Sequence, residues 1–580
     1  MKMLLRYLYP VRRRIALGVS IKFIGSIVEL FLPSLLAYLL DVIVPQAKLD
    51  GGMGSIFFYS SLMLVCAAIA WVGNITANRM AASTTRDAVR QLRQDLFDKT
   101  IRLSDARINA FSIPTLEMRL TGDTYNIHRM VGMMQRMGIR APILLIGGVI
   151  MTAVMEPVLT LILVATLPLI AWVMLGVTRK GVPLYDLLQR KTDDMVRVVR
   201  ENITGIRVVK ALSKTAYEKD RFEQINTAVS DSETKAGVTM ALTTPVMSFL
   251  LNGGLTLVIL AGAYRVNTGL TQAGTIIAFM SYFTIILNAM MSVTRMFIMC
   301  SKGIASANRI DEVMDTPPEA EELARCGCGE QREDMLVFED VSFSYNGRKN
   351  NLEHISFALP KGGTLGIIGA TGSGKSTLVK LIMRFYDAGQ GTVFLDGRDI
   401  KDIPLEQLRG KFGVAMQNDF LYADTVADNI CFEREIDKEQ LALAAEKAQA
   451  AEFIAQRKDG FEDQLTQSGH NLSGGQRQRL LVARALAGNP EILILDDSSS
   501  ALDYRTDAAM RSAIADMQPR PTTVVVAQRV SSVMNSDLIL VLEDGKALAS
   551  GTHEELMKHC ALYREIAQTQ MGGERVGSTC

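Results

Sequence analysis

The run GATGSGKST, residues 369–377, has the residue types and spacing of a loop that binds phosphate groups. It follows an apolar stretch, 364–370, and leads into a segment with helically spaced apolar residues. Its glycines let backbone N–H groups turn toward a β-phosphate, Lys375 can reach the β- and γ-phosphates, and Ser376 can offer its hydroxyl to Mg²⁺. We expect a nucleoside triphosphate to contact the whole run: Gly369, Ala370, Thr371, Gly372, Ser373, Gly374, Lys375, Ser376 and Thr377.

Two further motifs could take part in binding a nucleotide. The run ILILD, residues 492–496, is typical of a buried strand that ends in a carboxylate, so Asp496 could hold Mg²⁺ through water. Between the glycine-rich run at 369–377 and the strand at 492–496 lies LSGGQ, residues 472–476. It is followed by a long helical segment that stops at 488–490. Considered without any family, LSGGQ indicates only an anion-binding helix N-terminus.

The elements that must position these motifs belong to a soluble domain. From about Met335, short β-rich runs alternate with helical segments and are separated by Gly and Asp, which is the pattern of an α/β domain. The chain of 580 residues is too long for one core, and its 48 % hydrophobic and 21 % charged residues indicate segregated apolar and polar parts. We expect a membrane domain at 1–320, a linker at 321–334, an α/β domain at 335–571 and a tail at 572–580.

The first half contains six apolar stretches of about the 20 residues that a bilayer requires. They lie near 15–40, 54–76, 130–156, 158–178, 239–264 and 274–300. Lys and Arg concentrate in the N-terminal tail and in two long connections, 77–129 and 179–238, which are therefore cytoplasmic together with both termini. These connections are rich in helix-forming residues, so the membrane helices should continue into the cytoplasm. At 112–115 and 202–205 they could reverse and present a short transverse helix.

Three ionisable residues in the apolar stretches are candidates for function because charges are costly in lipid. Lys22 and Glu29 lie seven residues apart in the first stretch, roughly on one face, and Arg295 lies in the sixth. One alternative is that all three line a substrate path. The other is that Lys22 and Arg295 lie beyond the hydrocarbon, in cytoplasmic extensions.

Taken in order along the chain, these features resemble the exporters of the ABC family. LSGGQ matches the ABC signature in its place between the Walker A loop (369–377) and the Walker B strand (492–496), and the segments 119–131 and 198–212 fit the family's membrane domain. The resemblance covers nearly the whole chain and is closest to multidrug-type half-transporters. It implies a six-helix transmembrane domain joined to an α/β P-loop nucleotide-binding domain, in a bacterial cell membrane with the nucleotide-binding domain in the cytoplasm.

The resemblance also implies roles for individual residues. Two ATP molecules would be sandwiched between two such chains, so that each signature closes over the ATP of the opposite chain. Tyr345 resembles the aromatic residue that stacks on adenine, and Gln417 resembles the Q-loop residue that senses Mg²⁺ and the coupling helices. Asp503 belongs to the D-loop at 500–503. The nucleotide contacts of the signature would come from Leu472, Ser473, Gly474, Gly475 and Gln476, and the Mg²⁺ ligands would be Ser376, Gln417 and Asp496.

The sequence departs from the family at two catalytic positions. Where the family has a glutamate after Walker B, this chain has Asp497, whose shorter side chain withdraws the carboxylate by roughly 1 Å, enough to cost about 10²-fold in a positioned reaction. Where the switch loop has a histidine, this chain has Gln528, which cannot carry a proton or a positive charge. Both changes concern hydrolysis and leave ATP binding intact.

An intact signature beside a degenerate catalytic site predicts a different chain as partner. We expect a heterodimeric exporter in which the partner supplies the competent Glu and His. Alternatives are a slow homodimeric exporter and an ATP-gated channel or regulator. The apolar spans exclude a soluble ATPase, and the fusion of the two domains in exporter order disfavours an importer. The sequence does not identify the exported substrate.

Composition adds two expectations. The net charge of +1 gives no sign of a nucleic-acid partner, for which a strongly basic face would be needed, so we expect none. Of the seven cysteines, only Cys326 and Cys328 lie close together in sequence, and no Cys or His nearby would complete a metal site. A zinc site there remains one interpretation, and a flexible linker is the better one.

Overall fold

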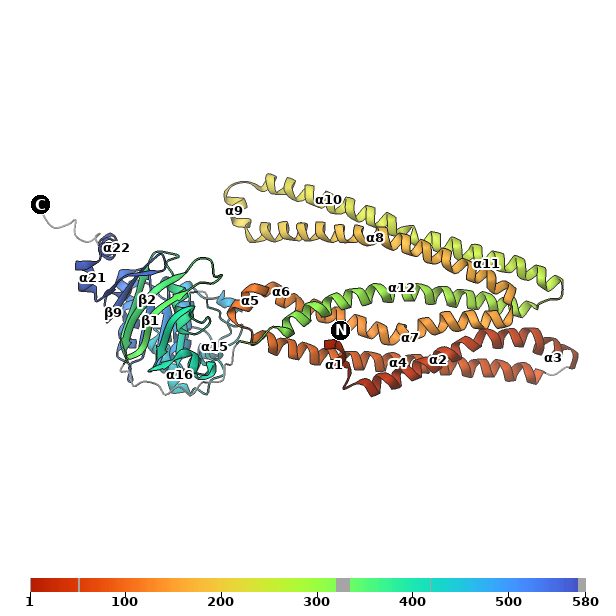
Figure 1. Cartoon of the computed structure of the whole chain (residues 1–580), viewed down its shortest axis with the longest axis horizontal. Helices are drawn as coiled ribbons and strands as arrows, with labels where there is room; N and C mark the ends of the chain where they lie inside the picture. The colour runs from red at the N-terminus through yellow and green to blue at the C-terminus, as the bar shows by residue number, and fades with distance from the viewer. Residues whose placement is uncertain (1, 51–52, 320–333, 418, 572–580) are drawn as a thin grey trace. The chain divides into compact units, whose positions relative to one another are not determined.

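The computed structural model describes residues 2–50, 53–319, 334–417 and 419–571 (Figure 1). The chain divides into two compact units, Met1–Ile101 with Ile113–Thr316, and Arg102–Ser112 with Pro317–Cys580. Of the expected linker at 321–334, only residue 334 is among the described residues. Cys326, Cys328 and the expected tail at 572–580 also lie outside them.

The first unit is helical, and within its described residues six helices are long and apolar enough to span a bilayer, as predicted. The helix bounds are α1 (Lys2–Leu8), α2 (Arg12–Tyr38) with the π-helix η1 (Leu39–Ile43) and α3 (Val44–Asp50), α4 (Met53–Ile101), α6 (Ile113–Met118) with the π-helix η2 (Arg119–Asp123) and α7 (Thr124–Met155), α8 (Pro157–Thr204), α9 (Ile206–Ala211), α10 (Thr215–Ala241), α11 (Thr243–Asn267) and α12 (Ala273–Asp315).

The long connections are mostly helical, as their composition predicts. Helix α4 has 49 residues, and at about 1.5 Å per residue it is more than twice as long as a hydrocarbon core of roughly 30 Å. Short helices lie at both expected reversals. Helix α5 (Asp105–Phe111) ends at Ser112, whose φ of 67° breaks the helical path, and α9 follows Gly205. The second reversal is narrower than expected because residues 202–204 still belong to α8.

The charged residues in the membrane unit have different surroundings. Lys22 is buried and its amine donates to Asn78 of α4 at 3.0 Å. Glu29 accepts two hydrogen bonds from Arg140 of α7, at 2.7 and 3.3 Å, and both side chains line a cavity. Arg295 is exposed within the unit. A role for Lys22, Glu29 and Arg295 in a substrate path stays a prediction.

The second unit is built on a ten-stranded sheet with the order β5-β4-β1-β2-β10-β9-β3-β8-β7-β6. Strands β9, β3, β8, β7 and β6 are parallel to one another, whereas β5, β4, β1 and β2 pair antiparallel. The strand bounds are β1 (Asp334–Phe343), β2 (Leu352–Pro360), β3 (Thr364–Gly369), β4 (Gln390–Leu395), β5 (Arg398–Asp399), β6 (Phe412–Ala415), β7 (Ile492–Asp496), β8 (Thr522–Val526), β9 (Leu538–Glu543) and β10 (Lys546–Gly551).

Helices and two apolar clusters cover the sheet. The helix bounds are α13 (Lys375–Ile382), α14 (Leu405–Gly410), α15 (Val426–Cys431), α16 (Lys438–Lys447), α17 (Ala451–Ala455), α18 (Gly474–Leu486), α19 (Tyr504–Ala515), α20 (Val530–Val533), α21 (His553–His559) and α22 (Ala561–Met571). Strands β7 and β8 are buried throughout, as expected for parallel strands covered on both faces. The carboxyl ends of β3, β6, β7 and β8 meet at one edge, where a site is expected in such sheets.

Candidate functional site

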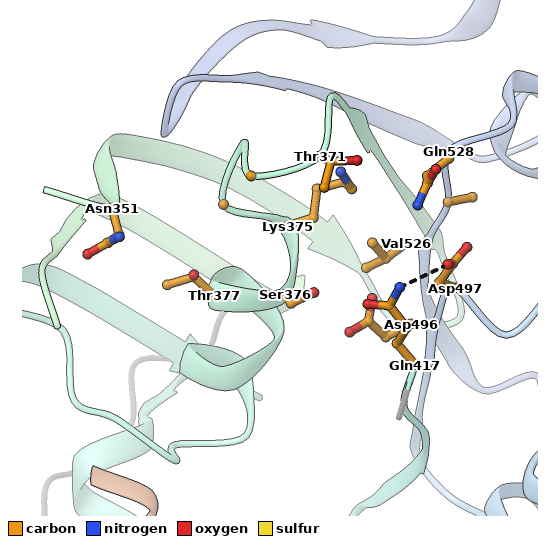
Figure 2. Close-up of a pocket in the computed structure, with 13 residues that line it drawn as sticks. Asn351, Thr371, Lys375, Ser376, Thr377, Gln417, Asp496, Asp497, Val526 and Gln528 are labelled. Atoms are coloured by element: carbon orange, nitrogen blue, oxygen red, sulfur yellow. Dashed lines mark hydrogen bonds between the residues drawn. The ribbon is translucent and has the colours of Figure 1, made fainter. Parts of the chain in front are cut away.

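The phosphate loop connects β3 to α13. Gly372 and Gly374 have φ values of 86° and 102°, a backbone region that favours glycine, so the sharp turn requires these residues. Residues of the loop and of the first turn of α13 line a pocket, which Figure 2 shows. The hydroxyl of Ser373 is buried in the loop without a hydrogen-bond partner in the described part of the chain.

The amine of Lys375 is held over this loop. It donates to the carbonyl oxygens of Gly369 and Ala370, at 2.8 and 2.7 Å. Burial lowers the pKa of Lys375, while the carboxylates of Asp496 and Asp497 act in the opposite direction. The amine therefore lies between the loop and the acidic residues, where it can pair with phosphate oxygens that enter the pocket.

The acidic wall of the pocket is formed at the end of β7. Asp496 is only 3 % exposed, and burial raises the pKa of its carboxyl, although a hydrogen bond with Ser376 opposes the rise. Gln417, which follows β6, donates to the Asp497 carboxylate at 3.3 Å (Figure 2). The side-chain oxygens of Ser376, Asp496 and Gln417 are hard donors of the kind that Mg²⁺ prefers, so these residues fit the predicted ion.

The backbone of Asp497 is fixed in place. Its φ of 52° is unusual for a residue other than glycine, and its N–H donates to Val526 at 2.9 Å. Its carbonyl oxygen accepts hydrogen bonds from Ser500 Oγ at 3.0 Å and from Gln478 at 3.3 Å. These hydrogen bonds on both sides of the main chain oppose a backbone shift that would carry the Asp497 carboxylate further into the pocket.

Gln528 lies on the same side of the pocket as Asp497. It follows β8, together with Val526 and Ala527, and Figure 2 shows it above Asp497, far from Asn351. Its side chain is exposed to the pocket, and its main-chain carbonyl accepts a hydrogen bond from Gln570 at 2.9 Å.

The signature forms the N-terminus of α18. Ser473 is the N-cap residue, and its hydroxyl accepts from the N–H of Gln476 at 3.2 Å, while the Gln476 side chain accepts from the N–H of Ser473 at 3.0 Å. This reciprocal pair is a capping box. Leu472 is buried in the domain core. Leu472 and Gln476 were both predicted to contact nucleotide, but their side chains have partners within this chain. Leu472 packs in the core, and Gln476 bonds to Ser473.

The signature and the D-loop together form a second surface. Ser473, Gly474 and Gly475 line it with Asp503, whose carboxylate caps α19 and whose pKa is lowered by hydrogen bonds from Thr506. Among the described residues, those that line the Lys375 pocket include none of 472–476.

Tyr345 lies beside the phosphate-loop helix. Its hydroxyl donates to Thr377 Oγ1 at 3.2 Å, and its ring is 44 % exposed. The ring contacts Phe343 and Tyr386 edge-on, with centroid separations of 4.9 and 5.0 Å. A partly exposed aromatic residue next to Thr377 is suited to stacking on a base.

Sequence reasoning missed two residues of the site. Asn351 lines the pocket and accepts a hydrogen bond from the N–H of Tyr345 at 3.2 Å. Gln478 joins α18 to the D-loop, because its amide donates to Ser500 Oγ at 2.9 Å and accepts from the N–H of Ala501 at 2.9 Å. Asn351 belongs to no motif, but the position of Gln478, five residues after Ser473 on a recognised helix, could have identified it.

Comparisons with known proteins identify the family of the chain. The ABC transporter transmembrane region family matches residues 15–290, and the ABC transporter family matches residues 352–500. An uncharacterized ABC transporter ATP-binding protein of Mycobacterium tuberculosis is 33 % identical over 585 residues and covers 99 % of both chains. YfiB, another uncharacterized ABC transporter ATP-binding protein, from Bacillus subtilis, is 33 % identical and covers 94 % of both chains.

Two further proteins also match nearly the whole chain. An ATP-dependent lipid A-core flippase of Vibrio vulnificus is 28 % identical and covers 96 % of this chain and 95 % of the flippase. The structure of a bacterial Atm1-family ABC exporter with ATP bound shares the fold, with a TM-score of 0.79 and 23 % identity over 97 % of this chain and 98 % of that one. The chain therefore belongs to the ABC transporter family, and it carries one membrane domain and one ATP-binding domain with the fold of an ABC exporter.

Proposed function

We propose that this chain is one subunit of a heterodimeric, ATP-driven exporter that binds ATP at its own site and hydrolyses it slowly. Its signature would serve the hydrolytic site of a different partner chain. The observation that carries the proposal is the pairing of Asp497 and Gln528 on one side of the pocket (Figure 2). The residues suited to bind phosphate and Mg²⁺ are present in the same pocket.

We attribute the slow hydrolysis to the short side chain of Asp497 and not to the pKa of its carboxyl. Burial raises the pKa of its carboxyl, which by itself would favour a general base near neutral pH. Its side chain is nevertheless one methylene shorter than that of glutamate, and the main chain of Asp497 is bonded to Val526 and Ser500. A displacement of roughly 1 Å can cost about 10²-fold, so we infer that geometry outweighs the favourable pKa.

Gln528 removes a second contribution to the same step. Its amide can donate one hydrogen bond to a γ-phosphate oxygen, but it stays neutral as negative charge develops during phosphoryl transfer. Charge-assisted hydrogen bonds are roughly twice as strong as neutral ones. We therefore expect both residues to slow hydrolysis while leaving affinity for ATP high.

The separate signature surface supports a site shared between two chains. Ser473, Gly475 and Asp503 form one surface, and the Lys375 pocket is another. A second chain is needed to bring such a surface onto a bound nucleotide, and the intact signature suits a partner site that hydrolyses ATP. The chain is an integral membrane protein with a cytoplasmic nucleotide-binding domain, and we place it in a bacterial cell membrane because its relatives are bacterial.

Lys375→Ala tests ATP binding at this chain's own site. The variant removes the cation that pairs with the β- and γ-phosphates, so photo-labelling of this chain by an azido-ATP analogue should fall roughly 10- to 100-fold. The ATPase activity of the assembled transporter should fall far less, because hydrolysis is assigned to the partner's site. Lys361→Ala, at an exposed lysine before β3, is the matched control and should change neither quantity.

Either of two results would count against the proposal. Undiminished labelling of the Lys375→Ala variant would contradict the assignment of the phosphate loop. Complete loss of ATPase activity in that variant would instead indicate that this chain hydrolyses its own ATP, as in a homodimer.

A further inference from the structure

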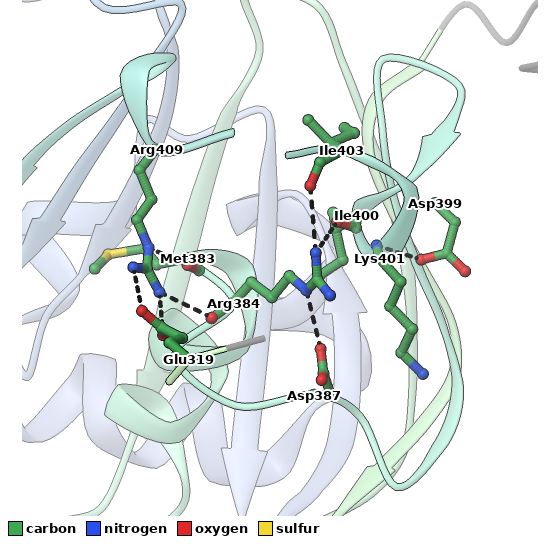
Figure 3. A network of polar contacts seen from close by, with 9 residues as sticks. All are labelled: Glu319, Met383, Arg384, Asp387, Asp399, Ile400, Lys401, Ile403 and Arg409. Carbon is green, nitrogen blue, oxygen red and sulfur yellow. Dashed lines mark hydrogen bonds and ion pairs between the residues drawn. The ribbon is translucent and has the colours of Figure 1, made fainter. Parts of the chain in front are cut away.

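Arg409 of α14 holds a residue that lies just beyond the last membrane helix. It donates two parallel hydrogen bonds to the Glu319 carboxylate, at 2.7 and 2.8 Å (Figure 3). The same guanidinium donates to the carbonyl of Arg384 at 3.1 Å and lies 4.9 Å from the centre of the Phe385 ring. Isolated surface ion pairs contribute little, but a two-point pair built into such a network fixes geometry.

Glu319 is also bonded to the first residue after α4. Its N–H donates to the carbonyl oxygen of Arg102 at 2.8 Å. The chain passes between the two units after Ile101, after Ser112 and after Thr316. Two of these three connections are therefore tied to each other, and through Glu319 both are tied to Arg409.

Helix α5 contacts the ATP-binding unit close to the Glu319–Arg409 pair, through Tyr386 and Lys380. The hydroxyl of Tyr386 donates to Asp105 at 2.8 Å, and the amine of Lys380 lies 3.3 Å from the same carboxylate. Asn109, one turn further along α5, lies 3.3 Å from the Tyr386 hydroxyl. The segment 383–386 thus contacts both α5 and the Glu319 pair.

This segment directly continues the phosphate-loop helix. Helix α13 runs for eight residues from Lys375, at the phosphate loop, to Ile382. In the following turn, Arg384 is 6 % exposed and donates to the carbonyls of Ile400 and Ile403, at 3.1 and 3.3 Å (Figure 3). The N–H groups of Arg384 and Phe385 also donate to the carbonyls of Leu381 and Lys380 in α13, at 3.1 and 2.9 Å. The turn is therefore attached to α13, and a displacement at the phosphates is expected to reach it.

We propose that Glu319 is a positioning residue that couples ATP binding to the membrane helices. Its pair with Arg409 holds the end of the α12 connection and the start of the α4–α5 connection on the turn that follows α13. Both connections then respond together when nucleotide binds. This inference goes beyond the proposed function and rests on it only in requiring that ATP binds at 369–377.

Hydrogen–deuterium exchange of the assembled transporter, with and without MgATP, tests the coupling. In the unmodified chain, MgATP should slow exchange both at 364–380 and at 96–111. In Glu319→Ala the slowing at 364–380 should persist, whereas the protection at 96–111 should fall about tenfold, the expected effect of losing a charge-assisted pair. Glu319→Asp keeps the charge on a shorter side chain and should restore part of the protection.

The matched control is Glu491→Ala, which removes an exposed ion pair with Lys411 of similar length, 2.8 Å, in the same unit. It should leave exchange at both segments unchanged. Wild-type protection at 96–111 in Glu319→Ala, with 364–380 still protected, would overturn the inference while leaving the proposed function intact. If MgATP did not slow hydrogen exchange at 364–380 in the unmodified chain, both the inference and the proposed function would be overturned.

Discussion

Gly475→Asp in this chain should reduce the ATPase activity of the assembled transporter by at least about 10²-fold, comparable to the loss of one donor that stabilises a transition state. A Cβ atom at this position would lie 3.1 Å from the carbonyl oxygen of Ala501 in the D-loop. The added side chain would thus press on the D-loop, and its carboxylate would lie on the surface that the signature forms with Asp503, which we propose meets the partner's nucleotide. Its negative charge would then oppose the γ-phosphate. The measurement is steady-state ATP hydrolysis by the purified complex.

Ser473→Arg should have a similar effect through bulk and loss of the N-cap. The cap alone contributes about 1 kcal/mol, so its loss must be separated from any effect on the nucleotide. Thr552→Arg is the matched control, because Thr552 caps α21 with the same reciprocal arrangement through Glu555. Equal losses of activity in Ser473→Arg and Thr552→Arg would indicate damage to the fold rather than to a shared ATP site.

Asp497→Glu combined with Gln528→His should accelerate hydrolysis at this chain's own site by roughly 10²-fold, since the longer carboxylate recovers the missing reach of about 1 Å. The histidine would add a donor that can carry positive charge. The expected gain is largest when both changes are present, because both groups act on the same chemical step.

This gain is measured by single-turnover hydrolysis in a complex whose partner chain has its catalytic glutamate replaced by glutamine. The ATP hydrolysed then comes from this chain's site. Each single variant is a control and should give less than the pair. A double variant that binds ATP normally and shows no acceleration would contradict the assignment of the slow step to Asp497 and Gln528.

The contiguous motifs allowed much of the fold and site to be predicted. The phosphate loop at 369–377 was predictable because an apolar run before a glycine-rich turn indicates a strand followed by a helix. The strand at 492–496 was predictable because it is a short apolar run that ends in a carboxylate. The six spans were equally predictable, because bilayer thickness sets helix length and each apolar stretch has to meet it.

Contacts between distant segments could not be predicted in this way. Nothing local at Glu319 indicates a bond to Arg409, 90 positions away, or to the carbonyl of Arg102. The grouping of α5 with the ATP-binding unit likewise depends on Asp105 meeting Tyr386. Capping explains why Gln476, predicted to contact nucleotide, has its side chain bonded to Ser473.

The proposed division of labour between two unlike ATP sites is tested most directly by the ATPase activity of the assembled transporter carrying Asp497→Asn. This change keeps the size of the side chain and removes its charge at the site assigned to slow turnover. The expected result is that more than about half of the activity remains, because little transition-state stabilisation is lost. A loss as large as that caused by Gly475→Asp would show that this chain hydrolyses its own ATP and would contradict the heterodimeric assignment.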